Sequence, residues 1–393
     1  MVGTGAIAGA HAAAVAAHAD RAVVVHAVDL GPARAEQFAA RHGLTGWGTD
    51  LATALTGDGA GPPDLAHICT PPGSHVPLAA QCLEAGVPVL LEKPPALSLA
   101  EVDQLLAVSE RTRVDVAVVF QHRFGAGAER AMVLLADARA RRAADGTDEE
   151  GEAGAGIGRP LVATCHTLWY RDADYFAVPW RGRWGVEGGG PTMGHGIHQI
   201  DLLLALLGPW EEVSAMAGRQ ARDTETEDVS TALVRFADGT LATIVNSLVS
   251  PRQTSSIRID AEYATLEVDH LYGYTDADWT FTPAPGHEHL SDRWVPDAAA
   301  PRSSHSSQMG AVLDAFGTRD EGSHPPAPLP VPLREARDTL ELVAAVYASA
   351  FTGRLIRRGD IVPGHPFYAR MNGSGAPWAT PDAARRTTEE DPA

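Results

Sequence analysis

The sequence predicts an α/β protein with two domains: a doubly wound parallel sheet comes first, and an α+β region with a large, mostly antiparallel open sheet follows. Two observations predict this order. Short apolar runs alternate with helix-like runs as far as residue 123, which is typical of a parallel sheet with helices on both faces. Beyond that residue, strand-like runs follow one another, as in an antiparallel meander. We place the domains at 1–123 and 124–370, and we expect a disordered tail over 371–393.

In the first region, each apolar strand leads into a helix whose start or end is marked in the sequence. Pro32 opens a helix that stops before Gly43, and Ser98 with Glu101 forms a capping box. The expected strands cover 22–29, 65–71, 88–92 and 114–121, and the expected helices cover 32–42, 74–84 and 98–110.

In the second region, Asp238-Gly239 between two strand patterns is a strong hairpin signal. A run rich in glycine and acidic residues at 144–158 is expected to be a mobile loop. The expected strands are 229–236, 240–247, 255–260 and 264–268, and the expected helices are 128–142 and 332–352.

Charge and composition argue against several function classes. Among 393 residues, 31 are Lys or Arg and 50 are Asp or Glu, which gives a formal net charge of −19. A surface this negative repels nucleic acid and anionic membranes, so we expect neither as a partner. No run of about 18 apolar residues predicts a transmembrane helix. Three cysteines without a CxxC pattern favour a reducing, cytoplasmic location.

A glycine motif at the start of the chain predicts a dinucleotide site. The motif fits G-x-G-x-x-G/A, and its expected cofactor contacts are Gly3, Gly5, Ala6, Ile7 and Ala8. Asp29 ends the second expected strand, where a carboxylate binds ribose hydroxyls and favours NAD. NADP remains an alternative cofactor, because the Arg34 guanidinium nearby can bind a phosphate. Only two residues precede the glycines, so either the first strand is short or the chain start is misplaced.

Lys93 is the only lysine in the chain; every other basic residue is arginine. Arginine stays protonated in proteins, whereas lysine can change its protonation state, so a single remaining lysine is a candidate for chemistry. Lys93 follows the expected strand 88–92, at the sheet edge where doubly wound folds bind ligands. There its ammonium group can stabilise a substrate alkoxide.

A second glycine run, 188–201, leads into an apolar helix and carries His198 near the helix start. An imidazole there can act as a general base, and Asp201 three residues later can orient it or stabilise its charge. His195, His198 and Asp201 also spell H-x-x-H-x-x-D. Their spacing drifts around the helix, so we expect no metal at these residues. Just upstream, an aromatic and arginine-rich run at 169–184 suits a polyhydroxylated ring or a carboxylate, although it can equally be core or interface.

Together these residues resemble the glucose-fructose oxidoreductase / inositol dehydrogenase / MocA (Gfo/Idh/MocA) family. The resemblance rests on GTGAIA at 3–8, ICTPPGSH at 68–75, LEKP at 91–94, QHRF at 121–124, IGRP at 157–160, and GGGPTMGHGIHQIDLLLALLG at 188–208. It implies an N-terminal Rossmann domain, a C-terminal α+β domain, and NAD(P)-linked oxidation or reduction of sugars, cyclitols or related hydroxy compounds. It further implies a homodimer or homotetramer formed through the C-terminal sheet.

The resemblance also implies roles for single residues. Lys93 matches the catalytic lysine and His198 the catalytic histidine of the family, and the EKP motif adds its acid to the expected cofactor site. Thr70, Pro71 and His75 match the loop on the nicotinamide side, and Glu92 and Lys93 complete the expected cofactor contacts. The chain departs from the family pattern at Gly194, where family members commonly carry an acid one helical turn before the histidine.

We therefore expect a cytoplasmic NAD(P)-dependent sugar dehydrogenase, in which His198 takes the hydroxyl proton and Lys93 stabilises the alkoxide. Two alternatives stay open at this point. One is a redox-neutral enzyme that uses tightly bound NAD for elimination, hydrolysis or epimerisation. The other is a non-catalytic dinucleotide-binding sensor.

Overall fold

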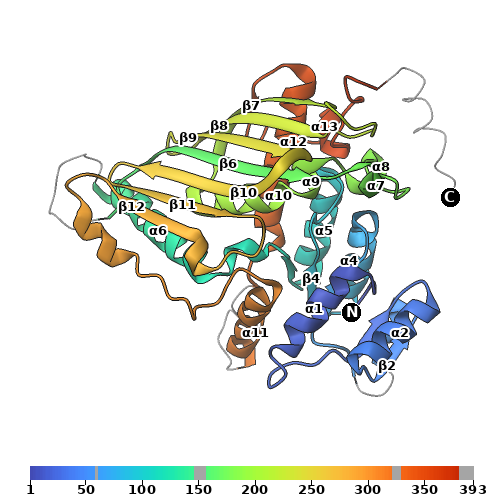
Figure 1. Cartoon of the computed structure of the whole chain (residues 1–393). Helices are drawn as coiled ribbons and strands as arrows, with labels where there is room; N and C mark the ends of the chain where they lie inside the picture. Colours follow the sequence, from blue (N-terminus) through green and yellow to red (C-terminus); the bar gives the residue numbers. More distant parts are fainter. Residues whose placement is uncertain (58–60, 146–155, 321–328, 380–393) are drawn as a thin grey trace.

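The computed structural model describes residues 1–57, 61–145, 156–320 and 329–379, and Figure 1 shows their arrangement. The N-terminal region forms the expected parallel sheet. Its strands are short; they are β1 (His26–Val28), β2 (Gly46–Gly48), β3 (Ala66–Ile68), β4 (Val89–Leu91) and β5 (Val116–Val118). β1 pairs in parallel with β2, and β3, β4 and β5 pair in parallel in that order.

The first strand of this sheet is a single residue. Val2 forms isolated parallel bridges to Val28 and Ile68, and so links the β1–β2 pair to the other three strands. The strand turns at once into the glycine loop, where Gly3 has a positive φ of 81° and a Cβ atom would lie 2.8 Å from Thr70 Cγ2.

Helices lie between these strands along the chain, as connections between parallel strands usually do. They are α1 (Ala6–Ala16), α2 (Pro32–His42), α3 (Leu51–Thr56), α4 (His75–Glu84) and α5 (Leu99–Thr112). Ser98 caps α5 as predicted, because its hydroxyl accepts a hydrogen bond of 3.2 Å from the Glu101 amide, but the reciprocal bond of the capping box is shifted by one residue. Glu101 in turn accepts from the Leu97 amide at 2.8 Å.

The C-terminal region is built on an eight-stranded sheet with the order β12-β11-β10-β6-β9-β8-β7-β13, in which only β6 and β9 pair in parallel. The strands are β6 (Pro160–Tyr170), β7 (Trp210–Gly218), β8 (Val229–Phe236), β9 (Leu241–Ser247), β10 (Val249–Ala261), β11 (Ala264–His270), β12 (Trp279–Pro283) and β13 (Ile356–Arg357). The mostly antiparallel open sheet and the Asp238-Gly239 hairpin are confirmed.

Helices pack against one face of this sheet, and in Figure 1 the strands pass in front of α10 and α12. The helices of this region are α6 (Ala126–Asp145), α7 (Ala173–Phe176), α8 (Trp184–Glu187), α9 (Pro191–Gly194), α10 (Ile197–Leu207), α11 (His305–Asp320), α12 (Leu333–Thr352) and α13 (Pro366–Ala369). α11 differs from the rest, because it packs against α1 of the first domain.

The C-terminal tail is ordered further than the sequence predicts. The tail was expected to be disordered from residue 371, but Met371 is buried and Trp378 donates a hydrogen bond of 2.9 Å to the Glu225 carbonyl. Apolar contacts therefore hold 371–379 on the second domain; 380–393 lie outside the described residues, as does most of the expected loop at 144–158. Within the described residues, no helix is long and apolar enough to span a bilayer.

Candidate active site

Lys93 comes directly after β4, at the carboxyl edge of the parallel sheet, and its side chain reaches into the second domain. Its Nζ donates a hydrogen bond of 2.8 Å to the carbonyl oxygen of Gly194, the last residue of α9. Burial lowers the pKa of the Lys93 ammonium, although the Glu92 carboxylate opposes that shift. The sole lysine thus bridges the two domains where a ligand of the sheet would bind.

His198 lies on the first turn of α10, four residues beyond the carbonyl that Lys93 contacts. Its side chain is buried, and its Nδ1 has no hydrogen-bond partner among the described residues. Burial, followed by the positive charge of Lys93, lowers the pKa of His198 well below its ordinary value. The imidazole is therefore neutral at physiological pH and available to take a proton.

His195 and His122 flank His198 on either side. The His195 Nδ1 atom is also buried and lacks a partner among the described residues, and the charge of Lys93 adds to burial in lowering the pKa of His195. The His122 ring lies 5.1 Å from that of His198 and 5.0 Å from that of Tyr272. Sequence reasoning missed His122 and Tyr272 as site residues. His122 stands within the QHRF motif quoted above, whereas nothing in the sequence around Tyr272 marks it.

The aromatic and arginine-rich run at 169–184 also packs against these histidines. The Trp169 ring packs at 5.1 Å from that of His195, with an interplanar angle of 73°. The Arg171 guanidinium lies over Trp169 at 4.8 Å and over Tyr175 at 5.3 Å. Arg181 stacks on Tyr175 at 4.4 Å. These contacts place an aromatic and cationic wall beside the histidines, so this part of the run is not simply core.

Asp201 does not reach His198, contrary to the expectation from its i+3 spacing. Its carboxylate is fully buried and accepts two hydrogen bonds of 2.7 Å from Arg123, with a third of 3.1 Å from Thr339. Burial raises the pKa of Asp201, while Arg123 opposes that shift. The Asp201 carboxylate is thus paired with the guanidinium of Arg123, a residue from another segment of the chain. Asp201 therefore anchors α10 and is better described as a positioning residue.

The glycine loop has the form that a dinucleotide needs. Gly5 is exposed at the N-terminus of α1, and a Cβ built there would meet no atom within 4 Å, so a phosphate can approach the backbone. Ala6 is exposed and Ile7 half-buried, whereas Ala8 is buried under the helix, as the close-packing position of the motif requires. The loop thus fits the pyrophosphate of NAD.

Asp29 lies beside this loop at the end of β1. Its Oδ2 accepts hydrogen bonds from the Thr4 amide at 3.0 Å and the Thr4 hydroxyl at 2.8 Å, and its Oδ1 pairs with Arg34. Although burial alone would raise its pKa, hydrogen bonds from Arg34, Gly31 and Thr4 lower the pKa of Asp29 to about 2. The carboxylate is therefore charged, as ribose recognition requires.

Two of the five residues expected to complete the cofactor site, His75 and Glu92, are buried and turn to other protein groups. His75 is fully buried and its two ring nitrogens lie 2.8 Å from the Thr70 carbonyl and 2.9 Å from the Pro94 carbonyl, so it holds the loop instead of facing a ligand. Glu92 is also buried and turns toward His11 at 2.8 Å. Thr70 is half-buried and Pro71 exposed, so these two remain accessible.

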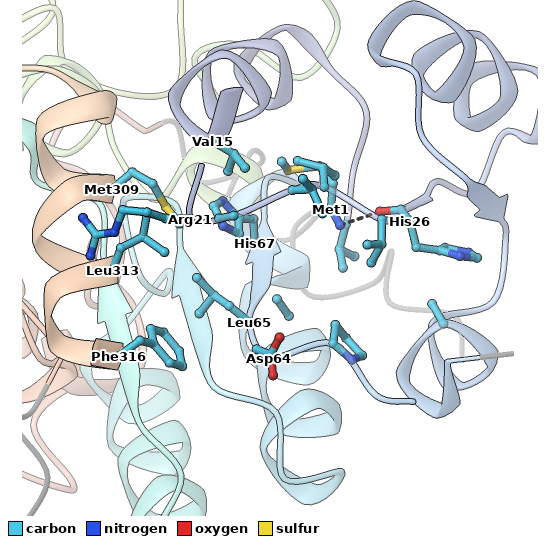
Figure 2. Close-up of a pocket in the computed structure, with 18 of the residues that line it drawn as sticks. Met1, Val15, Arg21, His26, Asp64, Leu65, His67, Met309, Leu313 and Phe316 are labelled. Atoms are coloured by element: carbon cyan, nitrogen blue, oxygen red, sulfur yellow. Dashed lines mark hydrogen bonds between the residues drawn. The ribbon is translucent and has the colours of Figure 1, made fainter. Parts of the chain in front are cut away.

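A separate cavity of about 620 Å³ lies near the opposite ends of β1 and β3, and Figure 2 shows its lining. The Met1 ammonium donates a hydrogen bond of 2.8 Å to the His26 carbonyl there, and Leu65 and Phe316 add apolar walls. Neither Lys93 nor a histidine of the glycine-rich helix lines this space. It is therefore distinct from the candidate active site.

Comparison with known proteins agrees with this geometry. Residues 1–120 match the family described as oxidoreductase family, NAD-binding Rossmann fold, and residues 152–267 match the GFO/IDH/MocA C-terminal domain. Together the two matches cover more than half of the chain.

Among solved structures, the chain resembles the WlbA dehydrogenase from Bordetella pertussis in complex with NADH and UDP-GlcNAcA. The identity is 26%, the TM-score is 0.74, and the match covers 91% of this chain and 97% of that one. The curated inositol 2-dehydrogenase of Rhizobium meliloti is 33% identical over 124 residues, or 32% of this chain and 36% of that protein. D-glucoside 3-dehydrogenase of Escherichia coli is 26% identical over 37% of this chain and 36% of its own length. The chain thus spans about a third of these two curated relatives.

Proposed function

The chain belongs to the Gfo/Idh/MocA family of NAD-binding oxidoreductases, and from this premise we propose that it transfers a hydride between a nicotinamide cofactor and a sugar, cyclitol or related hydroxy compound. One observation carries the proposal: Lys93 Nζ binds the Gly194 carbonyl, four residues before the buried His198, and the charge of Lys93 adds to burial in lowering the pKa of His198. An ammonium and an imidazole base are what oxidation of a secondary alcohol requires.

The chain's own residues prepare the hydroxyl group for oxidation. His198 removes the hydroxyl proton, because its imidazole is neutral and its Nδ1 makes no hydrogen bond with the described residues. Lys93 stabilises the oxyanion that forms, and its charge also keeps His198 unprotonated before the reaction. In the reducing direction the same two groups return the proton.

Bound NAD supplies the hydride acceptor in oxidation, and its reduced form supplies the hydride in reduction. Gly3 and Gly5 would hold the pyrophosphate against the start of α1, and Asp29 would hold the adenosine ribose. Thr70 and Pro71 remain the accessible candidates beside the nicotinamide. We propose NAD over NADP, because the charged Asp29 repels a 2′-phosphate.

We place the substrate between the histidines and the aromatic wall formed by Trp169 and Tyr175. Arg171 lies over both of these rings and makes its polar contacts with neutral groups, the Tyr170 carbonyl and the Gln253 amide oxygen. The WlbA relative was solved in complex with NADH and UDP-GlcNAcA. A carboxylate-bearing sugar would likewise find a cationic partner here.

We further propose a homodimer or homotetramer that forms through the C-terminal sheet. Apolar side chains are exposed on β6 to β9 of this sheet, namely Val162, Met216, Leu233 and Leu241. An apolar surface of this kind is typical of an interface. The three cysteines are free and buried, which supports a reducing cytoplasm as the location.

The test is turnover of a panel of sugars, sugar acids and cyclitols, with NAD⁺ or NADP⁺ and reduced-nicotinamide absorbance as the readout. We compare wild type with Lys93→Met, and use Arg21→Met as the control because Arg21 forms only an exposed ion pair with Asp314. We expect Lys93→Met to lose about 10²–10⁴-fold in kcat and still to bind NADH by fluorescence. Equal activity of Lys93→Met and wild type contradicts the assignment.

The same preparation separates the two alternatives. Reduced-nicotinamide absorbance in the purified protein, together with turnover that needs no added cofactor, identifies the redox-neutral enzyme. Cofactor-dependent binding of a partner, without turnover of any substrate in the panel, identifies the sensor.

A further inference from the structure

Three histidines and one glutamate gather in the interior of the molecule, away from the aromatic wall. They come from four elements: His11 from the second turn of α1, His67 from β3, Glu92 from the residue after β4, and His305 from the start of α11. His11, His67 and Glu92 are buried, and the His305 side chain is only 17% exposed. The hydride-transfer scheme uses none of these side chains.

The potential ligand atoms are close to one another. His11 Nε2 lies 2.8 Å from Glu92 Oε1, and His305 Nε2 lies 3.5 Å from the same oxygen. One ligand atom from each of these three residues falls within 4.8 Å of the other two. Four-coordinate zinc with bonds of about 2.1 Å holds its ligand atoms about 3.4 Å apart, so small side-chain rotations suffice to bind an ion here.

The surroundings of the cluster match those of known metal ligands. His11 Nδ1 lies 2.9 Å from the Nδ1 of the buried His67. A neutral His67 can accept the Nδ1–H of His11 and so leave the His11 Nε2 lone pair for an ion. Glu92 Oε2 accepts a hydrogen bond of 3.1 Å from the Lys93 amide, which fixes the carboxylate orientation.

Charge balance and space favour an ion in addition. The Glu92 side chain contacts two imidazoles and one amide among the described residues, and a buried carboxylate needs a positive partner. A space of about 10 Å³ adjoins His11, His67 and His305 and has Leu90 and Val119 as apolar walls. That volume is about enough for one water molecule, which would supply a fourth ligand.

We propose that His11, Glu92 and His305 form a site for one divalent transition-metal ion, zinc first, with His67 as the partner that orients His11. The ion would tie α11, a helix of the second part of the chain, to α1 and to the end of β4. Because Glu92 precedes Lys93, the ion would also steady the segment that carries the lysine. A purely hydrogen-bonded cluster, in which His11 donates to Glu92, is the competing description.

The experiment uses full-length protein without a histidine tag, stripped with chelator and titrated with Zn²⁺ against a chromophoric competitor. We expect one ion per chain, and Co²⁺ in place of Zn²⁺ should give the intense visible bands of a four-coordinate site. His305→Gln is the first variant, because His305 is the most exposed of the cluster. It should bind Zn²⁺ at least about tenfold more weakly. His11→Gln is the second variant, used if circular dichroism shows that the first is unfolded.

His289→Gln is the matched control, since His289 is exposed in the short 3-10 helix η4 (Glu288–Arg293), beside His287 and Glu288. It should bind zinc as wild type does. Less than 0.1 ion per chain at saturating Zn²⁺, or unchanged affinity in both His305→Gln and His11→Gln, overturns the site in favour of the hydrogen-bonded cluster. Loss of zinc binding in His289→Gln assigns the ion to the segment around His289 and likewise overturns the proposed site. Zinc binding is measured without substrate, so hydride transfer can fail while this site stands.

Discussion

The ammonium of Lys93 is bound to the carbonyl of Gly194 at 2.8 Å, at the position where the family resemblance led us to expect an acid. A glycine offers only its backbone oxygen to the lysine. That oxygen orients the ammonium but adds no full negative charge, so burial lowers the pKa of Lys93 with only the opposing charges of Glu92 and Glu187. With a glycine at this position, the pKa of the Lys93 ammonium is therefore lower than it would be beside a carboxylate.

Gly194→Asp should therefore strengthen the catalytic pair. A Cβ at Gly194 would meet no atom within 4 Å, and the residue has no positive φ, so the new side chain fits without strain. A carboxylate beside the ammonium raises the pKa of Lys93 and moves the alkaline limb of the kcat/KM profile to higher pH. Gly194→Asn has nearly the same shape without the charge and is the control. If both variants give the same profile, charge at this position is not what matters.

The acid limb of the same profile should report His198. Burial and the Lys93 charge lower the pKa of His198 below its ordinary value of about 6.5, so the base stays unprotonated and activity persists below that pH. In Lys93→Met the positive charge is gone, and the residual activity should show an acid limb displaced to higher pH. His198→Asn should lose the limb and about 10²–10⁴-fold in kcat. An acid limb that stays in place in Lys93→Met contradicts the electrostatic link.

Local patterns were enough to predict much of the fold. The Ser98 cap of α5 and the Asp238-Gly239 hairpin depend on neighbouring residues, and both are present. The expected strand at 22–29 was too long, because only His26–Val28 finds a parallel partner. Strand length is set by partners elsewhere in the chain, which a local pattern does not contain.

Some residues of the candidate site could likewise be predicted from local motifs, and others could not. Lys93 and His198 stand in motifs that mark them, whereas His122 and His305 become neighbours of site residues only through the packing of separate elements. Asp201 shows the limit of spacing rules. Its i+3 position suggests contact with His198, but Arg123, which enters from another segment, forms the stronger pair. The partner of Asp201 is therefore set by a charge pair between distant segments, which helical spacing alone does not predict.

Cofactor choice should change when the charge at Asp29 is removed. Because the pKa of Asp29 is lowered to about 2, its carboxylate stays charged throughout the working pH range and repels a 2′-phosphate. Asp29→Ser should lower kcat/KM for NAD⁺ and raise it for NADP⁺, changing their ratio at least tenfold, or about 1.4 kcal/mol. Arg34, now unpaired, should hold the phosphate. Asp29→Ser combined with Arg34→Gln should therefore lose most of the gain with NADP⁺; an unchanged ratio in Asp29→Ser speaks against ribose recognition by this residue.

Removing the charge of Asp201 should affect stability and leave the chemistry nearly intact. Asp201→Asn breaks a buried ion pair whose carboxylate is 0% exposed, and leaves Arg123 with only Glu335 as its acidic partner. Loss of one partner of such a pair costs about 3 kcal/mol in the free energy of unfolding, measured by urea denaturation. Asp338→Asn removes an exposed pair with Arg358 and should cost less than about 1 kcal/mol. In the folded Asp201→Asn protein, kcat and its acid limb should stay close to wild type, because the carboxylate bonds Arg123 and Thr339 instead of His198. A large fall in kcat at unchanged stability restores Asp201 to a role in orienting the base.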